Sequence, residues 1–203
     1  MQRHHAWITE FLWHYRKISV WERVLSGRDE DTRAADGLRW AGPDDTGLLT
    51  QAGYSADQLA ARFDAPCRVA VAVSGETLLA ASWYVPAADA PRPHEWCRLD
   101  LPDDGMWNFD LRIAPDTEAQ RLCPALFAFA HAGLRGDGYR YVHYIADERA
   151  PDDMRAYAAA GYVRVEDLVF LRIAQRSFLW LGRRFARGRW FPGNDLVLPT
   201  HRL

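Results

Sequence analysis

The chain has 203 residues, of which 49% are hydrophobic and 26% charged, values typical of a folded globular protein with one main domain. Its formal net charge of −2 argues against nucleic acid as a general partner, because that binding needs a positively charged surface. No segment reaches the roughly 20 apolar residues of a membrane span, and Glu10, Arg16 and Lys17 interrupt the apolar N-terminal run. We therefore expect neither a membrane span nor a signal peptide.

The cysteines indicate a reducing compartment. Cys67, Cys97 and Cys123 are too far apart for a metal-binding or redox-active pair, and their number is odd. We therefore expect free thiols, no metal site and a cytoplasmic location.

Residues 6–25 are predicted to form an N-terminal amphipathic helix. Apolar side chains recur there every three or four residues, at Trp7, Phe11, Tyr15, Ile18, Trp21 and Leu25. The charged run that follows is a linker, so residues 1–36 form a helix and linker ahead of the main domain. The helix either packs on the back of that domain or forms a homodimer contact.

The first half of the main domain, residues 37–174, shows hairpin signals. A short strand at residues 38–40 precedes a helix start at Pro43, and Ser55 caps a second helix that ends near residue 64. Residues 67–73 and 77–85 are predicted strands joined by a Ser-Gly-Glu turn, which is typical of a hairpin. A further strand is expected at residues 96–101.

The second half has the pattern of a parallel crossover. A strand over residues 106–113 is followed by an apolar helix, an aromatic strand over residues 139–146, a short helix after Pro151 and a strand from Tyr162. More than a dozen residues separate the first two strands, so we expect them to be parallel and adjacent.

This order of elements, over roughly residues 38–173, resembles the core of the GNAT N-acetyltransferases. The best-matched pieces are Ile-Ala-Pro-Asp at residues 113–116 and Tyr-Ala-Ala-Ala-Gly-Tyr at residues 157–162. The resemblance implies an α/β (α+β) fold with a mixed, partly antiparallel sheet and helices on both faces. It also implies acetyl-CoA or another acyl-CoA as donor and a small-molecule or peptide amine as acceptor.

The donor loop departs from the family. Where the family has Arg/Gln-x-x-Gly-x-Gly/Ala, residues 118–123 read Glu-Ala-Gln-Arg-Leu-Cys, without glycine. The resemblance places the donor against the end of the strand and the start of the next helix, at Leu111, Arg112, Ile113, Ala119, Gln120, Arg121, Leu122 and Cys123. That helix begins either at a Thr117 cap, with Pro124 inside it, or near Cys123, with Pro124 in its first turn. We favour the second start, because proline is tolerated in a first turn.

Two residues are candidates for catalysis. Tyr157 matches the position of the family's tyrosine acid, and a phenol can give a proton to a departing thiolate. Asp110 shares the polar face of its strand with Asn108 and Arg112, and its carboxylate could accept the amine's proton. The alternatives are a packed tyrosine and an Asp110–Arg112 ion pair.

Residues 175–203 form an extension rich in arginine and aromatic residues. Between Arg176 and Phe191 five arginines alternate with aromatic side chains, and the segment contains no acid. It is either a helix packed by its aromatic residues or a surface for an anionic membrane or an acyl carrier protein.

Three functions follow from these observations. They are a GNAT-like acyltransferase that uses an acyl-CoA, an inactive GNAT-fold binding or regulatory module, and an acyltransferase whose donor is an acyl carrier protein.

Overall fold

A computed structural model of the chain describes residues 13–26, 36–90, 97–115, 117, 119–147, 151–173, 176–181, 189–192 and 196–199. Its helices are η1 (Pro43–Asp45), α2 (Thr46–Thr50), α3 (Ala56–Asp64), η2 (Ala87–Asp89), α4 (Ala119–Gly136) and α5 (Pro151–Ala159). Its strands are β1 (Trp13–Val24), β2 (Leu38–Ala41), β3 (Arg68–Ser74), β4 (Thr77–Pro86), β5 (Cys97–Asp100), β6 (Gly105–Ile113), β7 (Tyr141–Asp147), β8 (Val163–Ile173), β9 (Arg176–Leu181), β10 (Arg189–Pro192) and β11 (Leu196–Pro199).

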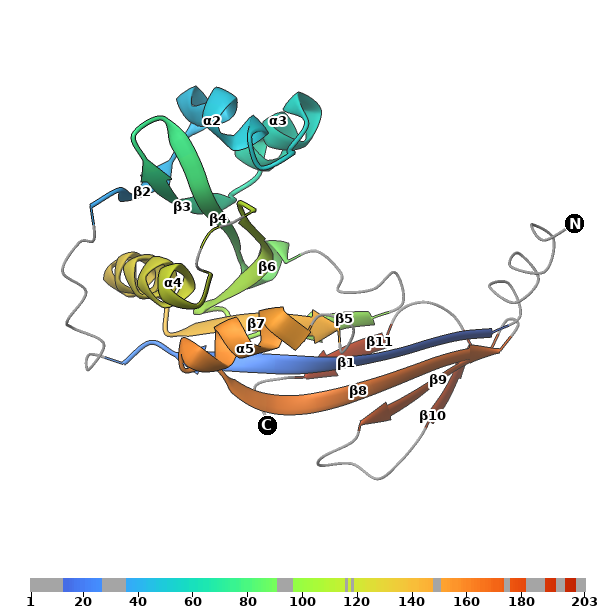
Figure 1. The fold of residues 1–203 in the computed structure, drawn as a ribbon. Helices are drawn as coiled ribbons and strands as arrows, with labels where there is room; N and C mark the ends of the chain where they lie inside the picture. Colours follow the sequence, from blue (N-terminus) through green and yellow to red (C-terminus); the bar gives the residue numbers. More distant parts are fainter. Residues whose placement is uncertain are drawn as a thin grey trace, which may run out of the picture.

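Nine of the strands form one mixed sheet (Figure 1), in the order β10-β9-β8-β1-β7-β6-β4-β3-β2. Strands β6 and β7 are adjacent and parallel, which confirms the predicted crossover. The pairs β2–β3, β3–β4 and β4–β6 are antiparallel, as the hairpin signals indicated. The predicted mixed, partly antiparallel sheet is therefore confirmed.

Helices cover both faces of the sheet because side chains alternate along β3 and β4. Val69 and Val71 pack with Leu49 of α2 and Leu59 of α3 in one core cluster. The intervening alanines of β3 face the other way, into a second cluster built around Phe127 of α4. A period of two along a strand with both faces covered produces this division.

The N-terminal segment differs from its prediction. Residues 13–24 of the expected helix form the strand β1, which lies antiparallel between β7 and β8 (Figure 1). Ser19 and Val20, outside the predicted apolar stripe, are buried to 0% and 1% exposure. The segment is rich in aromatic and β-branched residues, and two partner strands satisfy its backbone, which outweighs the helical spacing. Residues 6–12 lie outside the described ranges.

Helix α4 begins at Ala119, so our preferred start near Cys123 is wrong. Pro124 lies inside the helix, where it removes the hydrogen bond that an N–H would make to the carbonyl four residues earlier. The earlier start lengthens an apolar face: Leu122 packs against the same core as the buried Cys123 and Leu126. We attribute the outcome to this additional packing.

The C-terminal extension also contains strands, so the packed helix, the first of its two alternatives, is wrong for the residues described. β9 and β10 form a hairpin that continues the main sheet beyond β8. β11 pairs in parallel with β5 in a separate two-stranded sheet. Residues 182–188, which hold Arg183 and Arg184, lie outside the described ranges, so the membrane and carrier-protein partners stay predictions. Among the residues described, no helix is long and apolar enough to cross a membrane.

Candidate functional site

The parallel strands β6 and β7 part half-way along β6. Their pairing runs from Gly105–Tyr141 to Asn108–Tyr144 and goes no further. β6 nevertheless keeps its pairing with β4 as far as Ile113. The β7-facing edge of β6 beyond Asn108 therefore presents N–H and C=O groups to which an extended ligand can bond.

A bulge lies at the point where the strands part. In the pairing of β4 with β6, Tyr84 is opposite Asn108 and Trp83 is opposite Asp110, so Phe109 is an extra residue. One extra residue exchanges the two faces of the strand that follows it. The sequence placed Asn108, Asp110 and Arg112 on one face, and this is wrong. Asn108 bonds to α5 on one side of the sheet, whereas Asp110 and Arg112 contact α3 and the loop after α2 on the other.

Tyr157 reaches the last paired rung from α5. Its hydroxyl donates a hydrogen bond to Asn108 Oδ1 at 2.9 Å, and its ring stacks on Tyr144 with the centroids 3.6 Å apart. Asn108 Nδ2 in turn donates to Ser82 Oγ at 2.9 Å, which orients the amide. Tyr157 thus lies where β6 and β7 diverge, although its exposure is 0%. Its role as the acid stays a prediction.

Asp110 lies on the opposite face from Tyr157. Its Oδ2 accepts a hydrogen bond from Arg62 Nη2 at 2.7 Å, and its Oδ1 is 3.5 Å from Arg112 Nε. Asp110 therefore forms the ion pair with Arg112 that was the alternative to a catalytic role, and it has Arg62 as a second partner. Both carboxylate oxygens contact guanidinium groups, so an amine's proton would have to compete with them. The role of Asp110 as a base stays a prediction.

Arg62 and Tyr54 belong to this cluster, and the sequence analysis did not identify them. The Arg62 guanidinium lies over the rings of Tyr54, Trp83 and Phe109, at 4.9, 4.8 and 5.0 Å from their centroids. Burial, reinforced by the charge of Asp110, raises the pKa of Tyr54 to about 12, so its hydroxyl stays neutral. Arg62 and Asp110 are 48 positions apart, and no local pattern links them.

The predicted donor residues lie at the carboxyl end of β6 and in the first turns of α4. Cys123 is buried and Leu122 packs against the core, so neither offers a free side chain at the helix start. The side chains of Ala119, Gln120 and Arg121 are outside what the structure describes, as is Glu118. The pyrophosphate contacts expected there stay predictions.

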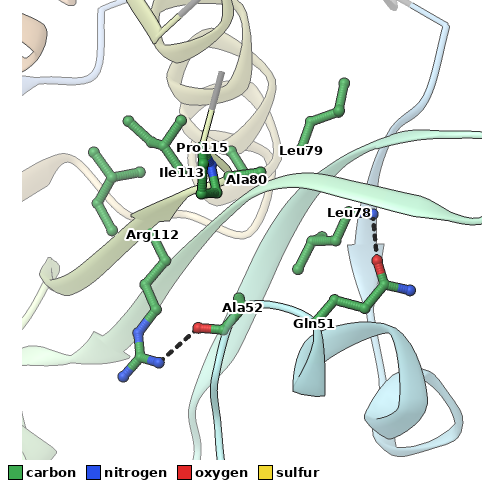
Figure 2. A pocket seen from close by; sticks show the side chains of 10 residues that line it. Gln51, Ala52, Leu78, Leu79, Ala80, Arg112, Ile113 and Pro115 are labelled. Carbon is green, nitrogen blue, oxygen red and sulfur yellow. Dashed lines mark hydrogen bonds between the residues drawn. The ribbon is translucent and has the colours of Figure 1, made fainter. Parts of the chain in front are cut away.

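A pocket of about 370 Å³ opens beyond the end of β6. It is lined by the loop after α2, residues 78–80 of β4 and residues 111–115 (Figure 2). Leu111, Arg112 and Ile113, predicted as donor residues, are among its lining residues. The Arg112 side chain points toward the loop after α2, and its Nη1 donates to the Ala52 carbonyl at 2.8 Å. It thus points away from the helix start at which the donor loop was expected.

A buried histidine lies behind Tyr157. His131 Nε2 is 2.9 Å from the Tyr162 hydroxyl, and burial, with a smaller contribution from the Arg23 charge, lowers the pKa of His131 to about 3. His131 is therefore neutral near pH 7 and serves the core. Within the described ranges, no three His, Cys, Asp or Glu residues form a group that could hold a metal ion.

The depressed pKa of His131 predicts acid sensitivity. The unfolded chain binds a proton at His131 below a pKa of about 6.5 and the folded chain does not, so the free energy of unfolding falls as the pH drops below that value. Between pH 7 and pH 5, the free energy of unfolding of the parent protein should fall by about 2 kcal/mol more than that of His131→Gln. Urea unfolding of both proteins at the two pH values measures this difference. Equal pH dependence in the two proteins would contradict the neutral-histidine assignment.

Solved structures resemble this fold. A GNAT N-acetyltransferase from Sphaerobacter thermophilus superposes with a TM-score of 0.55 at 13% identity, over 83% of this chain and 54% of that one. A GNAT-family protein from Novosphingobium aromaticivorans superposes with a TM-score of 0.54 at 12% identity, over 85% of this chain and 66% of that one. An acetyltransferase of the GNAT family from Colwellia psychrerythraea superposes with a TM-score of 0.52 at 10% identity, over 85% of this chain and 61% of that one.

The chain thus spans about half to two thirds of the length of these neighbours. In sequence, it matches no protein-family model and no curated protein. Its fold is that of the GNAT acetyltransferases, as the resemblance of its elements implied.

Proposed function

We propose that the chain is an acyltransferase that moves an acetyl or other acyl group from a CoA thioester to an amine. The observation that carries the proposal is the position of the Tyr157 hydroxyl at the rung where β6 and β7 part. An extended pantetheine arm can bond to the open edge of β6, which needs no particular side chain. A thioester at the end of that arm would lie next to Tyr157.

The reaction has a defined balance. The amine nitrogen forms a bond to the thioester carbonyl carbon, the carbon–sulfur bond breaks, and the electron pair leaves with sulfur. Tyr157 gives its proton to that sulfur, and the amine's proton leaves to Asp110, directly or through water. The products are an amide and free CoA. Incubating the protein with acetyl-CoA and a panel of amines, and following thiol release and amide mass, tests the proposal.

The altered donor loop predicts weak CoA binding. We expect a dissociation constant in the upper micromolar range or worse, corresponding to about −5 to −6 kcal/mol. The loop has no glycine to bring backbone N–H groups near a pyrophosphate, and Glu118 adds a negative charge there. Glu118→Gly should tighten binding by removing that charge and a Cβ, whereas Arg121→Ala should weaken it.

Titration calorimetry with CoA on the parent and both variants measures these changes. Glu76→Gly makes the same substitution in the exposed turn between β3 and β4 and should change nothing. Tight binding by the parent protein would show that the loop binds phosphates without glycine.

A binding or regulatory module without catalysis is the second candidate. Two observations favour it: the ring of Tyr157 has no exposed surface, and both oxygens of Asp110 contact guanidinium groups. Absence of CoA binding in the parent and in Glu118→Gly would favour this module over the enzyme.

A further inference from the structure

We propose that the pocket beyond β6 holds the carboxylate of the amine acceptor, so that the acceptor is a compact amino carboxylate. The inference rests on the acyltransferase proposal and names its substrate class. The carboxylate is an anchor and takes no part in the reaction.

The lining of the pocket suits one anionic group on a small apolar body. Leu78 of β4 lies on the same side of the sheet as Arg112, whereas Leu79, Leu111 and Ile113 line the pocket from the side that packs against the α4 cluster. Of the described residues that line the pocket, Arg112 alone carries a charge. The volume of about 370 Å³ is near the lower end of the range for small-molecule sites, which favours a compact ligand.

The Arg112 guanidinium is held in place before any ligand binds. Nη1 donates to the Ala52 carbonyl, and the guanidinium lies over the Tyr54 ring at 3.8 Å from its centroid. The next residue, Gly53, has φ 79°, a left-handed conformation that favours glycine and shapes the loop whose Ala52 carbonyl accepts this bond. Nη2 has no hydrogen-bond partner among the residues described. A fixed guanidinium with free donor capacity binds a carboxylate at low entropic cost.

The local charge also favours an anion. Arg62 and Arg112 share the single carboxylate of Asp110, so the formal charge of the three side chains is one positive unit. Their side-chain exposures of 20%, 33% and 18% keep them partly screened from water, which strengthens their attraction for an anion.

The position of Arg112 fits the proposed reaction. Arg112 follows Asp110 by two residues on the same face, a rise of roughly 6.6 Å along the strand toward its carboxyl end. The bulge at Phe109, where β6 and β7 part, lies just before Asp110. An acceptor anchored at Arg112 therefore needs only a few bonds to bring its amine to that point.

Calorimetry without donor tests the pocket directly. The probes are glycine, β-alanine and 4-aminobutyrate, the neutral amines of matching length, and O-phosphoethanolamine. At least one amino carboxylate should bind with a millimolar or tighter dissociation constant, and its matched neutral amine should bind at least tenfold more weakly.

Two variants of Arg112 and one control locate the binding. Arg112→Gln should weaken the amino carboxylate at least tenfold, and Arg112→Lys, which keeps the charge but loses the planar donors, should weaken it several-fold. Arg39→Gln is the matched control, because Arg39 lies in another shallow pocket and its guanidinium already pairs with Asp45. It should leave binding unchanged. Melting curves establish whether each variant is folded. If Arg112→Gln does not fold, the binding measured with Arg112→Lys tests the role of Arg112.

Three results would overturn the inference: equal binding of neutral amines, binding that survives both Arg112 variants, or tighter binding of the phosphate probe. Failure of the acyltransferase proposal can be distinguished from failure of the pocket proposal. Amino carboxylate binding through Arg112 without any acyl transfer would reject the enzyme and keep the pocket, whereas equally fast acylation of neutral amines would keep the enzyme and reject the pocket.

Discussion

Tyr157→Phe is expected to lower turnover by about 100-fold or more, the usual scale for loss of a general acid, with little effect on donor affinity. The Tyr157 hydroxyl bonds to Asn108, a residue of the last rung before β6 and β7 part, so its phenol lies close to the expected position of the thioester. Steady-state kinetics with a saturating amine, together with CoA calorimetry, separates turnover from binding. Unchanged turnover would remove Tyr157 from the mechanism.

The same variant should also lose stability. Removing the hydroxyl leaves the Oδ1 atom of Asn108 buried without its donor, at a cost of about 1–3 kcal/mol. Tyr162→Phe is therefore the matched control, because it removes a buried hydroxyl that bonds to His131 in the same aromatic cluster. It should show a similar loss of stability, yet its turnover should stay within a few-fold of the parent value.

Val20→Asp should destabilise the protein by about 4 kcal/mol, because it buries a charge without a partner in the centre of the sheet. Val20 is 1% exposed and lies on β1 between β7 and β8. Had residues 6–25 formed the predicted surface helix, Val20 would lie off its apolar stripe and the change would be nearly neutral. Denaturant unfolding of the variant measures the loss.

Val24→Asp is the control for this experiment. It makes the same substitution at the end of the same strand, where Val24 is 53% exposed, and should change stability by less than about 0.5 kcal/mol. Equal effects of the two substitutions would contradict the central position of β1.

Two predictions that depended on neighbouring residues, a helix cap and a hairpin turn, succeeded. Ser55 caps α3, with reciprocal hydrogen bonds to Gln58, and Ser-Gly-Glu turns β3 into β4. Such signals act within a few residues, where geometry leaves the backbone few choices. The parallel pairing of β6 with β7 was also predictable, because a long helical connection between adjacent strands imposes it.

The candidate site was predictable only in part. Tyr157 was identified by its match to the family's tyrosine position, and its hydroxyl bonds to Asn108 where β6 and β7 part; its catalytic role stays a prediction. Arg62 could not be found, because its partner Asp110 is distant in sequence. The bulge at Phe109 was also missed, and that residue separates Asp110 from the face of Tyr157.

The amino-acid sequence by itself determined the order and type of most strands and helices, the cap of α3 and the hairpin of β3 and β4. The tertiary structure decided that residues 13–24 are a central strand, that α4 accepts Pro124 inside it, and that Arg112 faces a pocket beyond β6. The first group depends on contacts between residues close in the chain, whose patterns can be read directly. The second depends on partners distant in the chain, because the free energy of packing against them outweighs the local preferences. These partners are β7 and β8 for β1, the core for α4 and the loop after α2 for Arg112.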